Sequence, residues 1–371
     1  MNKFDYEALR ADAIFKGEPR WMYEKIDEPL PPESVWETVP DYYSAHVDQK
    51  NARVREIMSG IKKSEAFAFF TDAHVRQSAM TSVPILRSIL KNTDVRDVIY
   101  GGDTVSAWTD ETDILLDIDY FMRAYAFANP YIVRGNHDMY GKRYHYTDRG
   151  VVKTPAEVYA HIMKKNASRV VGEENKNYYY FDHPKTRTRY IVIDTNEIIT
   201  PMLIENGIWE CDVTITQEQI QWFINLLNET PREWGVIVCG HTPIVKELRW
   251  AFPKACIFGT LIETYNRCGR FDGISWDGAD AFPVYADFTA AEGRVFLNVC
   301  GHGHVDDLYV SSTDCIYVET HCDSVGNNNG GSPYPRAAGT VTETVIDVFI
   351  LDRDTGKLHI VRYGAGEDRE T

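Results

Sequence analysis

The chain has 371 residues, of which 44% are hydrophobic and 25% are charged, and its formal net charge is −16. This composition is typical of a globular protein whose core is large enough to fold without disulfides. The acidic balance repels nucleic-acid phosphates and anionic membranes at long range, which weakens the case for a sequence-nonspecific nuclease. The seven cysteines show no CxxC spacing, and the sequence has no apolar leader and no long apolar run. We therefore expect a cytoplasmic chain without a membrane partner.

The first 65 residues are rich in glutamate, proline, tryptophan and tyrosine, and prolines at 31, 32 and 40 predict an irregular segment. We expect residues 1–65 to form an N-terminal extension that packs on the main domain. Contacts from this extension to a substrate or partner are the alternative.

From residue 66 onward, short apolar runs alternate with amphipathic stretches. Periodicity predicts helices at 78–92, 113–128, 154–165 and 216–227. It predicts strands at 67–71, 98–100, 131–133, 178–181, 190–194, 236–239, 295–300, 316–319, 345–351 and 358–363. Two stretches lack a clean period: 246–293 is interpreted as a long insert, and 323–336 as a loop that either lines a site or is solvated.

Five short runs, each directly after a predicted strand, end in residue types that bind metal ions. They are Asp72-Ala73-His74, Gly102-Asp103, Gly135-Asn136-His137-Asp138, Gly240-His241 and Gly301-His302-Gly303-His304. Because the carboxyl ends of strands gather at one edge of a sheet, we expect these side chains to converge. Their glycines allow sharp turns and close backbone approach.

Carboxylates, imidazoles and one amide, without a thiolate, suit Mn, Fe, Zn or Ni better than a structural zinc site. A single histidine is usually structural, but five of the eleven histidines fall in these runs. The other six are expected to be structural. His321, near Cys322 and Asp323, is the best further candidate for a ligand, although a supporting or structural role is favoured for it. One ion cannot use all the candidate ligands, so two ions sharing one carboxylate are predicted at Asp72, His74, Asp103, Asn136, His241, His302 and His304.

The order DxH, GD, GNHD, GH and GHxH resembles the calcineurin-like metallophosphoesterase superfamily over about residues 65–310. The resemblance implies an α/β fold, a four-layer α/β/β/α sandwich of two mixed sheets, formed here by residues 66–371. The extension and the insert at about 246–293 lie outside the minimal family core.

The resemblance also implies roles for single residues. One ion would be held by Asp72, His74 and His304, and the other by Asn136, His241 and His302. Asp103 would bridge both ions. His137 would act as a general acid or stabilise the leaving oxygen, and Asp138 would orient that histidine.

The expected activity is hydrolysis of a small-molecule phosphomonoester or phosphodiester, with nucleotides among the candidate substrates. The nucleophile would be a hydroxide generated between two divalent or trivalent ions. A nuclease of the same superfamily would need a basic groove, and the sequence has no Lys/Arg-rich run. A non-catalytic metal-binding scaffold is the other alternative, and the presence of His137 disfavours it. Residues 102–108 lack the arginine of the GDxVDRG motif, which argues against a protein phosphatase.

Two further residue types have alternative interpretations. Arg134 is expected to form a salt bridge under the sheet, with a phosphate contact as the alternative. Most of the 22 tyrosines and 8 tryptophans are expected to fill the core and its rim. The alternative is that a residue in 246–293, or Tyr334, stacks on a nucleobase.

Overall fold

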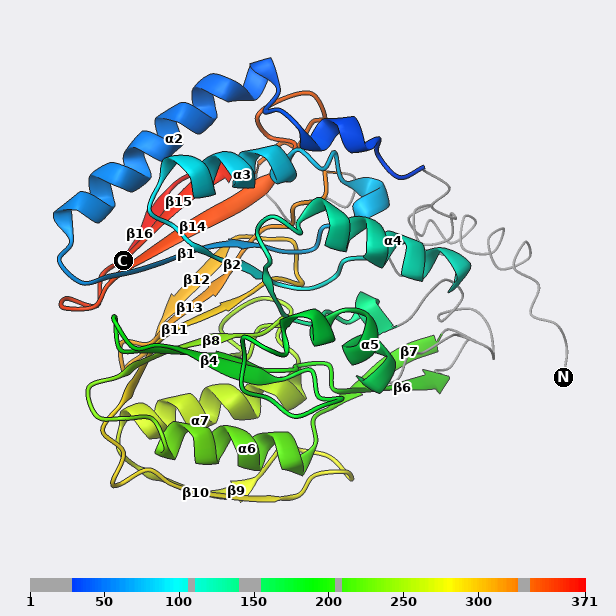
Figure 1. The fold of residues 1–371 in the computed structure, drawn as a ribbon. Coiled ribbons are helices and arrows are strands. Elements are labelled where there is room, and N and C mark those ends of the chain that lie inside the picture. Colours follow the sequence, from blue (N-terminus) through cyan, green and yellow to red (C-terminus); the bar gives the residue numbers. More distant parts are fainter. Residues whose placement is uncertain (1–28, 106–110, 140–154, 204–208, 326–333) are drawn as a thin grey trace, which may run out of the picture.

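The computed structural model describes residues 29–105, 111–139, 155–203, 209–325 and 334–371. In these residues, two six-stranded sheets lie between two layers of helices (Figure 1). The arrangement confirms the expected four-layer α/β/β/α sandwich.

The first sheet is mixed, because β1 pairs in parallel with β2 and antiparallel with β14. Its strands, in spatial order, are β16 (Arg369–Glu370), β15 (Leu358–Gly364), β14 (Val345–Asp352), β1 (Ser64–Phe70), β2 (Asp97–Tyr100) and β3 (Tyr131–Ile132).

The second sheet has four parallel central strands and an antiparallel strand at each edge. Its strands, in spatial order, are β12 (Asp307–Val310), β13 (Ile316–Glu319), β11 (Arg294–Cys300), β8 (Gly235–Cys239), β5 (Thr188–Val192) and β4 (Tyr179–His183).

Aromatic side chains fill the space between the two sheets. Phe67 of β1 stacks on Phe349 of β14 with ring centroids 5.1 Å apart, and it meets Tyr190 of β5 edge-on at 5.6 Å. Tyr131 of β3 stacks on Phe181 of β4 at 3.7 Å. Because the central strands are covered on both faces, they read as continuous apolar runs, which is why the sequence locates them well.

Helices cover the outer face of each sheet (Figure 1). The first sheet is covered by α2 (Asp41–Gly60) and α3 (Ser82–Asn92), and α4 (Glu111–Ala124) follows β2 in the chain. The second sheet is covered by α6 (Gln217–Asn228) and α7 (Cys256–Asn266). The side chain of Thr216 caps α6 by accepting a hydrogen bond from the Gln219 N–H.

The prediction of an irregular segment before residue 65 is wrong for residues 41–60, which form α2. Its buried stripe is narrow: Tyr43, Val47, Asn51 and Val54. One of the four is polar, and Asn51 accepts a hydrogen bond from Tyr363. The stripe has helical spacing, but the prolines before residue 41 and the polar remainder conceal it.

The stretch 246–293 also has regular structure, because it contains α7 and the hairpin of β9 (Arg270–Ile274) and β10 (Pro283–Asp287). A second unpredicted hairpin is formed by β6 (Ile198–Leu203) and β7 (Trp209–Thr214). The helix predicted at 154–165 is divided into α5 (Pro155–His161) and η5 (Met163–Asn166), and residue 154 lies outside the described residues. Across the described chain, every helix is too short or too polar to cross a membrane.

Candidate metal centre

The predicted ligands lie on loops that directly follow five strands. Asp72 and His74 follow β1, Asp103 follows β2, and Asn136 follows β3. In the second sheet, His241 follows β8, while His302 and His304 follow β11. Contacts among these side chains show that both sheets bring their loops to one place, in two groups.

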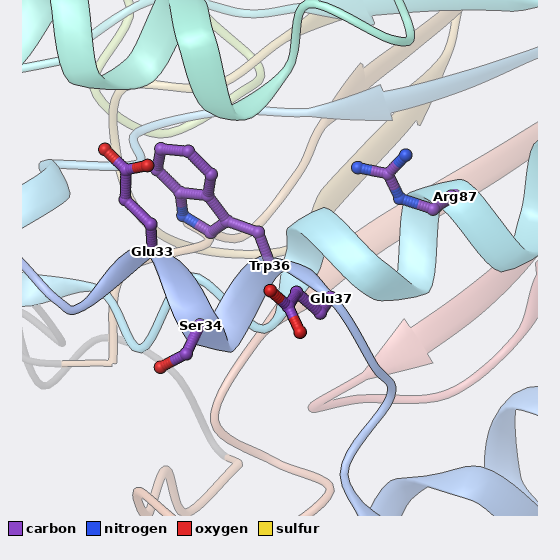
Figure 2. Close-up of a pocket in the computed structure, with 5 residues that line it drawn as sticks. All are labelled: Glu33, Ser34, Trp36, Glu37 and Arg87. Carbon is purple, nitrogen blue, oxygen red and sulfur yellow. The ribbon is translucent and has the colours of Figure 1, made fainter.

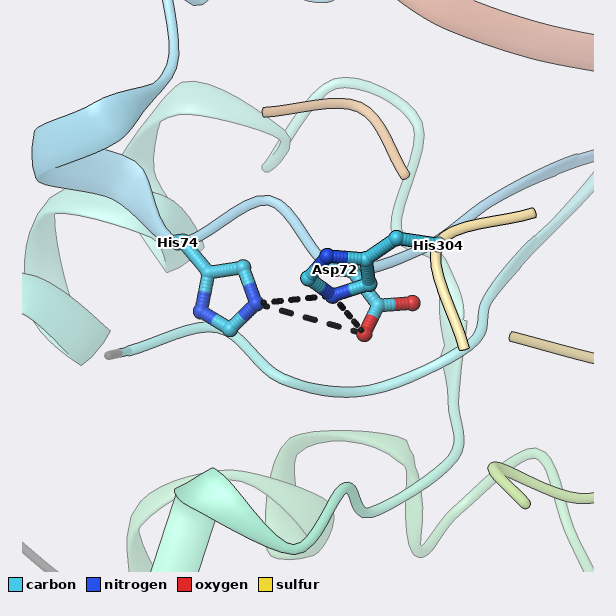
Figure 3. Close-up of side chains that lie close together, drawn as sticks. All are labelled: Asp72, His74 and His304. Atoms are coloured by element: carbon cyan, nitrogen blue, oxygen red, sulfur yellow. Dashed lines mark hydrogen bonds and ion pairs between the residues drawn. The ribbon is translucent and has the colours of Figure 1, made fainter. Parts of the chain in front are cut away.

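The first group is Asp72, His74 and His304, all buried (Figure 3). Nε2 of His304 lies 3.1 Å from Oδ1 of Asp72 and 3.4 Å from Nε2 of His74. Nε2 of His74 lies 4.0 Å from the same Asp72 oxygen. Three electron-rich atoms therefore surround one small volume.

The second group is Asp103, His241 and His302, and the amide of Asn136 joins it. Oδ1 of Asn136 lies 2.9 Å from Nε2 of His241 and 3.0 Å from Nδ1 of His302. Oδ2 of Asp103 lies 3.2 Å from Nε2 of His241. The structure thus brings together all seven predicted side chains.

A backbone N–H group holds one oxygen of each of the two carboxylates, Asp72 and Asp103. Oδ2 of Asp72 accepts from the His302 N–H at 3.1 Å, and Oδ1 of Asp103 accepts from the His137 N–H at 2.8 Å. Oδ2 of Asp103 is buried, and in the described residues it accepts no backbone hydrogen bond but lies 3.2 Å from Nε2 of His241. A buried carboxylate oxygen is costly unless a proton on its neighbour or a cation neutralises it, so the donor set fits a metal ion here.

Carbonyl groups behind two histidines set their tautomers. Nδ1 of His74 donates to the Val105 carbonyl at 2.8 Å, and Nδ1 of His241 donates to the Gly101 carbonyl at 2.7 Å. In the neutral form, Nε2 of each ring is then a lone pair that faces its group. Supporting acceptors of this kind orient histidines that bind metals.

Burial and neighbouring imidazoles lower the pKa of His74 and of His302, each to about 3. Both rings are therefore neutral near pH 7, which is the form that binds a metal. Burial opposes a charge on His241, but the Asp103 carboxylate outweighs it and raises the pKa of His241 to about 9. Without a metal, a proton on His241 would offset the charge of Asp103, so metal binding there releases a proton.

Five of the seven candidate ligands have a left-handed backbone, which is uncommon for residues other than glycine. The φ angles are 53° for Asp72, 39° for His74, 58° for Asp103, 78° for His302 and 53° for His304. Such conformations cost energy and gather at functional sites, where the surrounding structure holds them.

Asp138 joins two of the ligand loops. Its carboxylate accepts hydrogen bonds from the N–H groups of Gly135 at 2.8 Å, Thr104 at 2.8 Å and Asp103 at 3.1 Å. The side chain is buried. These bonds fix the loop after β2 against the loop after β3.

His137 lies at the edge of the site in η4 (His137–Met139), with its side chain 25% exposed. Its ring meets that of His74 edge-on at 5.2 Å, and its Nε2 lies 3.7 Å from Oδ2 of Asp103. It is therefore beside both groups and open to solvent.

Arg134 is fully buried and pairs with Asp194 at 2.7 Å. This is the expected salt bridge, and the phosphate contact is not available to a side chain in that position. His321 is also buried, with Nδ1 lying 3.2 Å from the Arg336 guanidinium. In the described residues, His321 belongs to neither group of candidate metal ligands, and its supporting or structural role stays a prediction.

Several neighbours of the site carried no signal in the sequence. The thiol of Cys322 contacts His304, and Glu319 accepts the Gly303 N–H at 2.9 Å. Phe252 packs edge-on against His302, with ring centroids 4.9 Å apart. Each contact joins residues that are distant in the chain. The residue types and spacing that indicate the candidate ligands therefore do not indicate these partners.

A separate open pocket of about 500 Å³ lies between η2 (Glu33–Trp36) and α3 (Figure 2). It is lined by Glu33, Ser34, Trp36, Glu37 and Arg87. None of these residues belongs to the two metal-binding groups.

Comparisons with known proteins agree with the geometry. A model of the family described as calcineurin-like phosphoesterase matches residues 66–306. A search of curated proteins gave no match. A solved structure of a dimetal phosphatase from Danio rerio is similar over 82% of this chain and 98% of its own, with 10% identity and a TM-score of 0.53.

A 5′-nucleotidase from Candida albicans is similar over 76% of this chain and 46% of its own, with 15% identity and a TM-score of 0.37. At 10% identity the Danio rerio structure bears on the fold alone, and the family rests on the match to residues 66–306.

Proposed function

Since the chain belongs to the calcineurin-like phosphoesterase family, we propose that it hydrolyses small-molecule phosphate esters, monoesters or diesters, with two bound metal ions. The observation that carries the proposal is the convergence of two neighbouring ligand groups, one of Asp72, His74 and His304 and the other of Asp103, His241 and His302. The net charge of −16 favours a small substrate over a nucleic acid.

We assign Asp72, His74 and His304 to one ion and Asn136, His241 and His302 to the other, with Asp103 touching both. The mixed oxygen and nitrogen donors suit Mn, Fe, Zn or Ni. When bound, two such ions supply Lewis-acid stabilisation of phosphate oxygens and lower the pKa of water.

The protein's own groups would do the remaining work. His137, beside both groups and partly exposed, would donate a proton or a hydrogen bond to the leaving alkoxide. We assign Asp138 a positioning role in place of the expected orientation of His137, because its oxygens hold three backbone N–H groups.

The experiment is hydrolysis of p-nitrophenyl phosphate and bis-p-nitrophenyl phosphate by protein stripped of metal and then reloaded with Mn²⁺. We expect reloading to raise the rate by more than about 10³-fold, because the ions supply several kcal/mol of transition-state stabilisation. The ratio of the two rates tells monoester from diester preference. Asp103→Asn should lose both metal pairing and turnover, and full turnover by this variant with two metals bound would overturn the assignment.

A further inference from the structure

We propose that Trp250 and Phe252 form an aromatic wall beside the metal centre that binds a planar ring in the alcohol part of the substrate. This inference rests on the proposed function and deepens it, because it names a chemical class of ester. The wall belongs to the segment between β8 and η6 (Pro253–Ala255).

Phe252 places the wall on the open side of the site. Its ring meets that of His302 edge-on at 4.9 Å, and both side chains are half-buried. His137 on the same centre is 25% exposed, whereas Asp72, His74 and His241 are buried. A substrate therefore reaches the centre past the partly exposed rings of His137 and His302, and Phe252 lies next to His302.

Trp250 extends the wall along the loop that carries two ligands. A Cβ added to Gly303 would lie 2.4 Å from Cδ1 of the Trp250 indole, so the indole is against the backbone between His302 and His304. Even so, Trp250 is 65% exposed. A large apolar ring beside a reactive centre, left open to water, is suited to cover part of a ligand.

The backbone holds Trp250 in this position. Its φ angle is 60°, a left-handed conformation that is an outlier for a bulky side chain. Leu248 is buried on one side of it. On the other side, the Phe252 carbonyl accepts the Ala255 and Cys256 N–H groups at 2.9 and 3.2 Å. Strain fixed by its flanks is typical of functional positions.

The chemistry of the wall favours a neutral planar group. An indole face stacks on flat π-systems, whereas a saturated ring gains only apolar burial. The same segment exposes charges of both signs, Lys246 and Arg249 against Glu247, so it provides no single-sign partner for a charged ring. We therefore assign the wall to an aryl or heteroaryl ring.

The experiment compares benzyl phosphate with cyclohexylmethyl phosphate, which share an alkyl leaving oxygen and differ in the flatness of the ring. We expect Trp250→Ala to lower the benzyl preference in kcat/KM about tenfold, mainly through KM. Trp250→Phe should retain most of the preference. Tyr285→Ala on β10 removes another exposed aromatic ring of the stretch 246–293. It should leave kcat/KM for both substrates unchanged.

Binding of benzylphosphonate and cyclohexylmethylphosphonate to the Mn²⁺-loaded protein, measured by calorimetry, gives a readout that needs no turnover. We expect the wild-type protein to prefer benzylphosphonate and Trp250→Ala to lose that preference. Equal binding of the two by the wild type, or a preference that survives in Trp250→Ala, would overturn the inference. If neither ester is turned over while the binding preference depends on Trp250, the wall stands and the proposed hydrolysis fails.

Discussion

Two features of His137 bear on its role. Its side chain is 25% exposed. Its backbone N–H, and not its ring, holds Oδ1 of Asp103 at 2.8 Å. Removing the imidazole therefore leaves the contact that orients the Asp103 carboxylate.

We expect His137→Ala to keep both metal ions and to lower kcat by about 10²–10⁴-fold, as for the loss of a positioned acid. The loss should be larger for benzyl phosphate than for p-nitrophenyl phosphate, because an alkoxide needs protonation more than a nitrophenolate does. Metal content by mass spectrometry and kcat for the two esters check this. Loss of a metal ion would instead make His137 a ligand.

The convergence of the candidate ligands was predictable residue by residue because each follows a buried strand. Asp72, Asp103 and His241 need only the strand and the loop to be placed. The thiol of Cys322, on the loop after β13, contacts His304, and the ring of Trp250 lies against Gly303, so both are placed by contacts between segments distant in the chain. A single sequence has no spacing that records such contacts.

At the scale of elements, the metal centre depends on loops that approach each other very closely. A Cβ on Gly135 would lie 2.0 Å from Oδ1 and 2.3 Å from the backbone nitrogen of Asp103. The loops after β2 and β3 can meet at this distance only if residue 135 has no side chain. Asp138 then ties the two loops together.

We expect Gly135→Ala to displace Asp103 and to weaken binding of the metal pair by at least about tenfold, as does loss of a residue that orients a ligand. Mn²⁺ titration by calorimetry measures the affinity. Gly60→Ala, at the end of α2, is the control because a Cβ there meets no atom within 4 Å. Unchanged affinity in Gly135→Ala would show that the loops can separate without loss of the site.

The strands that the sequence located best are short apolar runs such as β1 and β8, and the helices it located, α3, α4 and α6, have a wide apolar face. Helix α2 was missed because its buried stripe is one residue wide and contains Asn51. Helix α7 buries Ile257, Phe258, Leu261 and Ile262 at helical spacing. The surrounding glycine- and aspartate-rich sequence conceals this spacing, since turn residues dominate a window of that length.

At the scale of the whole molecule, the metal centre joins the two sheets at the carboxyl ends of their strands, and an ion cluster joins them at the opposite end. Glu65 near the start of β1 is buried, and its Oε1 lies 2.9 Å from Nδ1 of His183 at the end of β4. Tyr190 of β5 donates to the same oxygen at 2.7 Å. Asp97 of β2 lies 3.7 Å from Nε2 of His183.

These contacts set opposite pKa shifts in the two partners. Burial opposes the charge on His183, but Glu65, Asp97 and Asp182 outweigh it and raise the pKa of His183 above 6.5. Burial likewise opposes the charge on Glu65, but hydrogen bonds from His183, Thr186 and Tyr190 lower its pKa below 4.5. The pair therefore stabilises the fold most between these two values, and its contribution is lost as pH rises through the raised pKa of His183.

We expect His183→Gln to destabilise the protein more at about pH 5.5 than at about pH 8.5, on either side of the ordinary histidine pKa of about 6.5. Urea titrations give the free energy of unfolding of wild type and variant at each pH. Taking the difference between the two proteins cancels the contribution of other titrating histidines, which is common to both. His161→Gln, at an exposed histidine of α5, should show no such pH dependence. A difference that is equal at both pH values would mean that the two sheets are held at this end by packing alone.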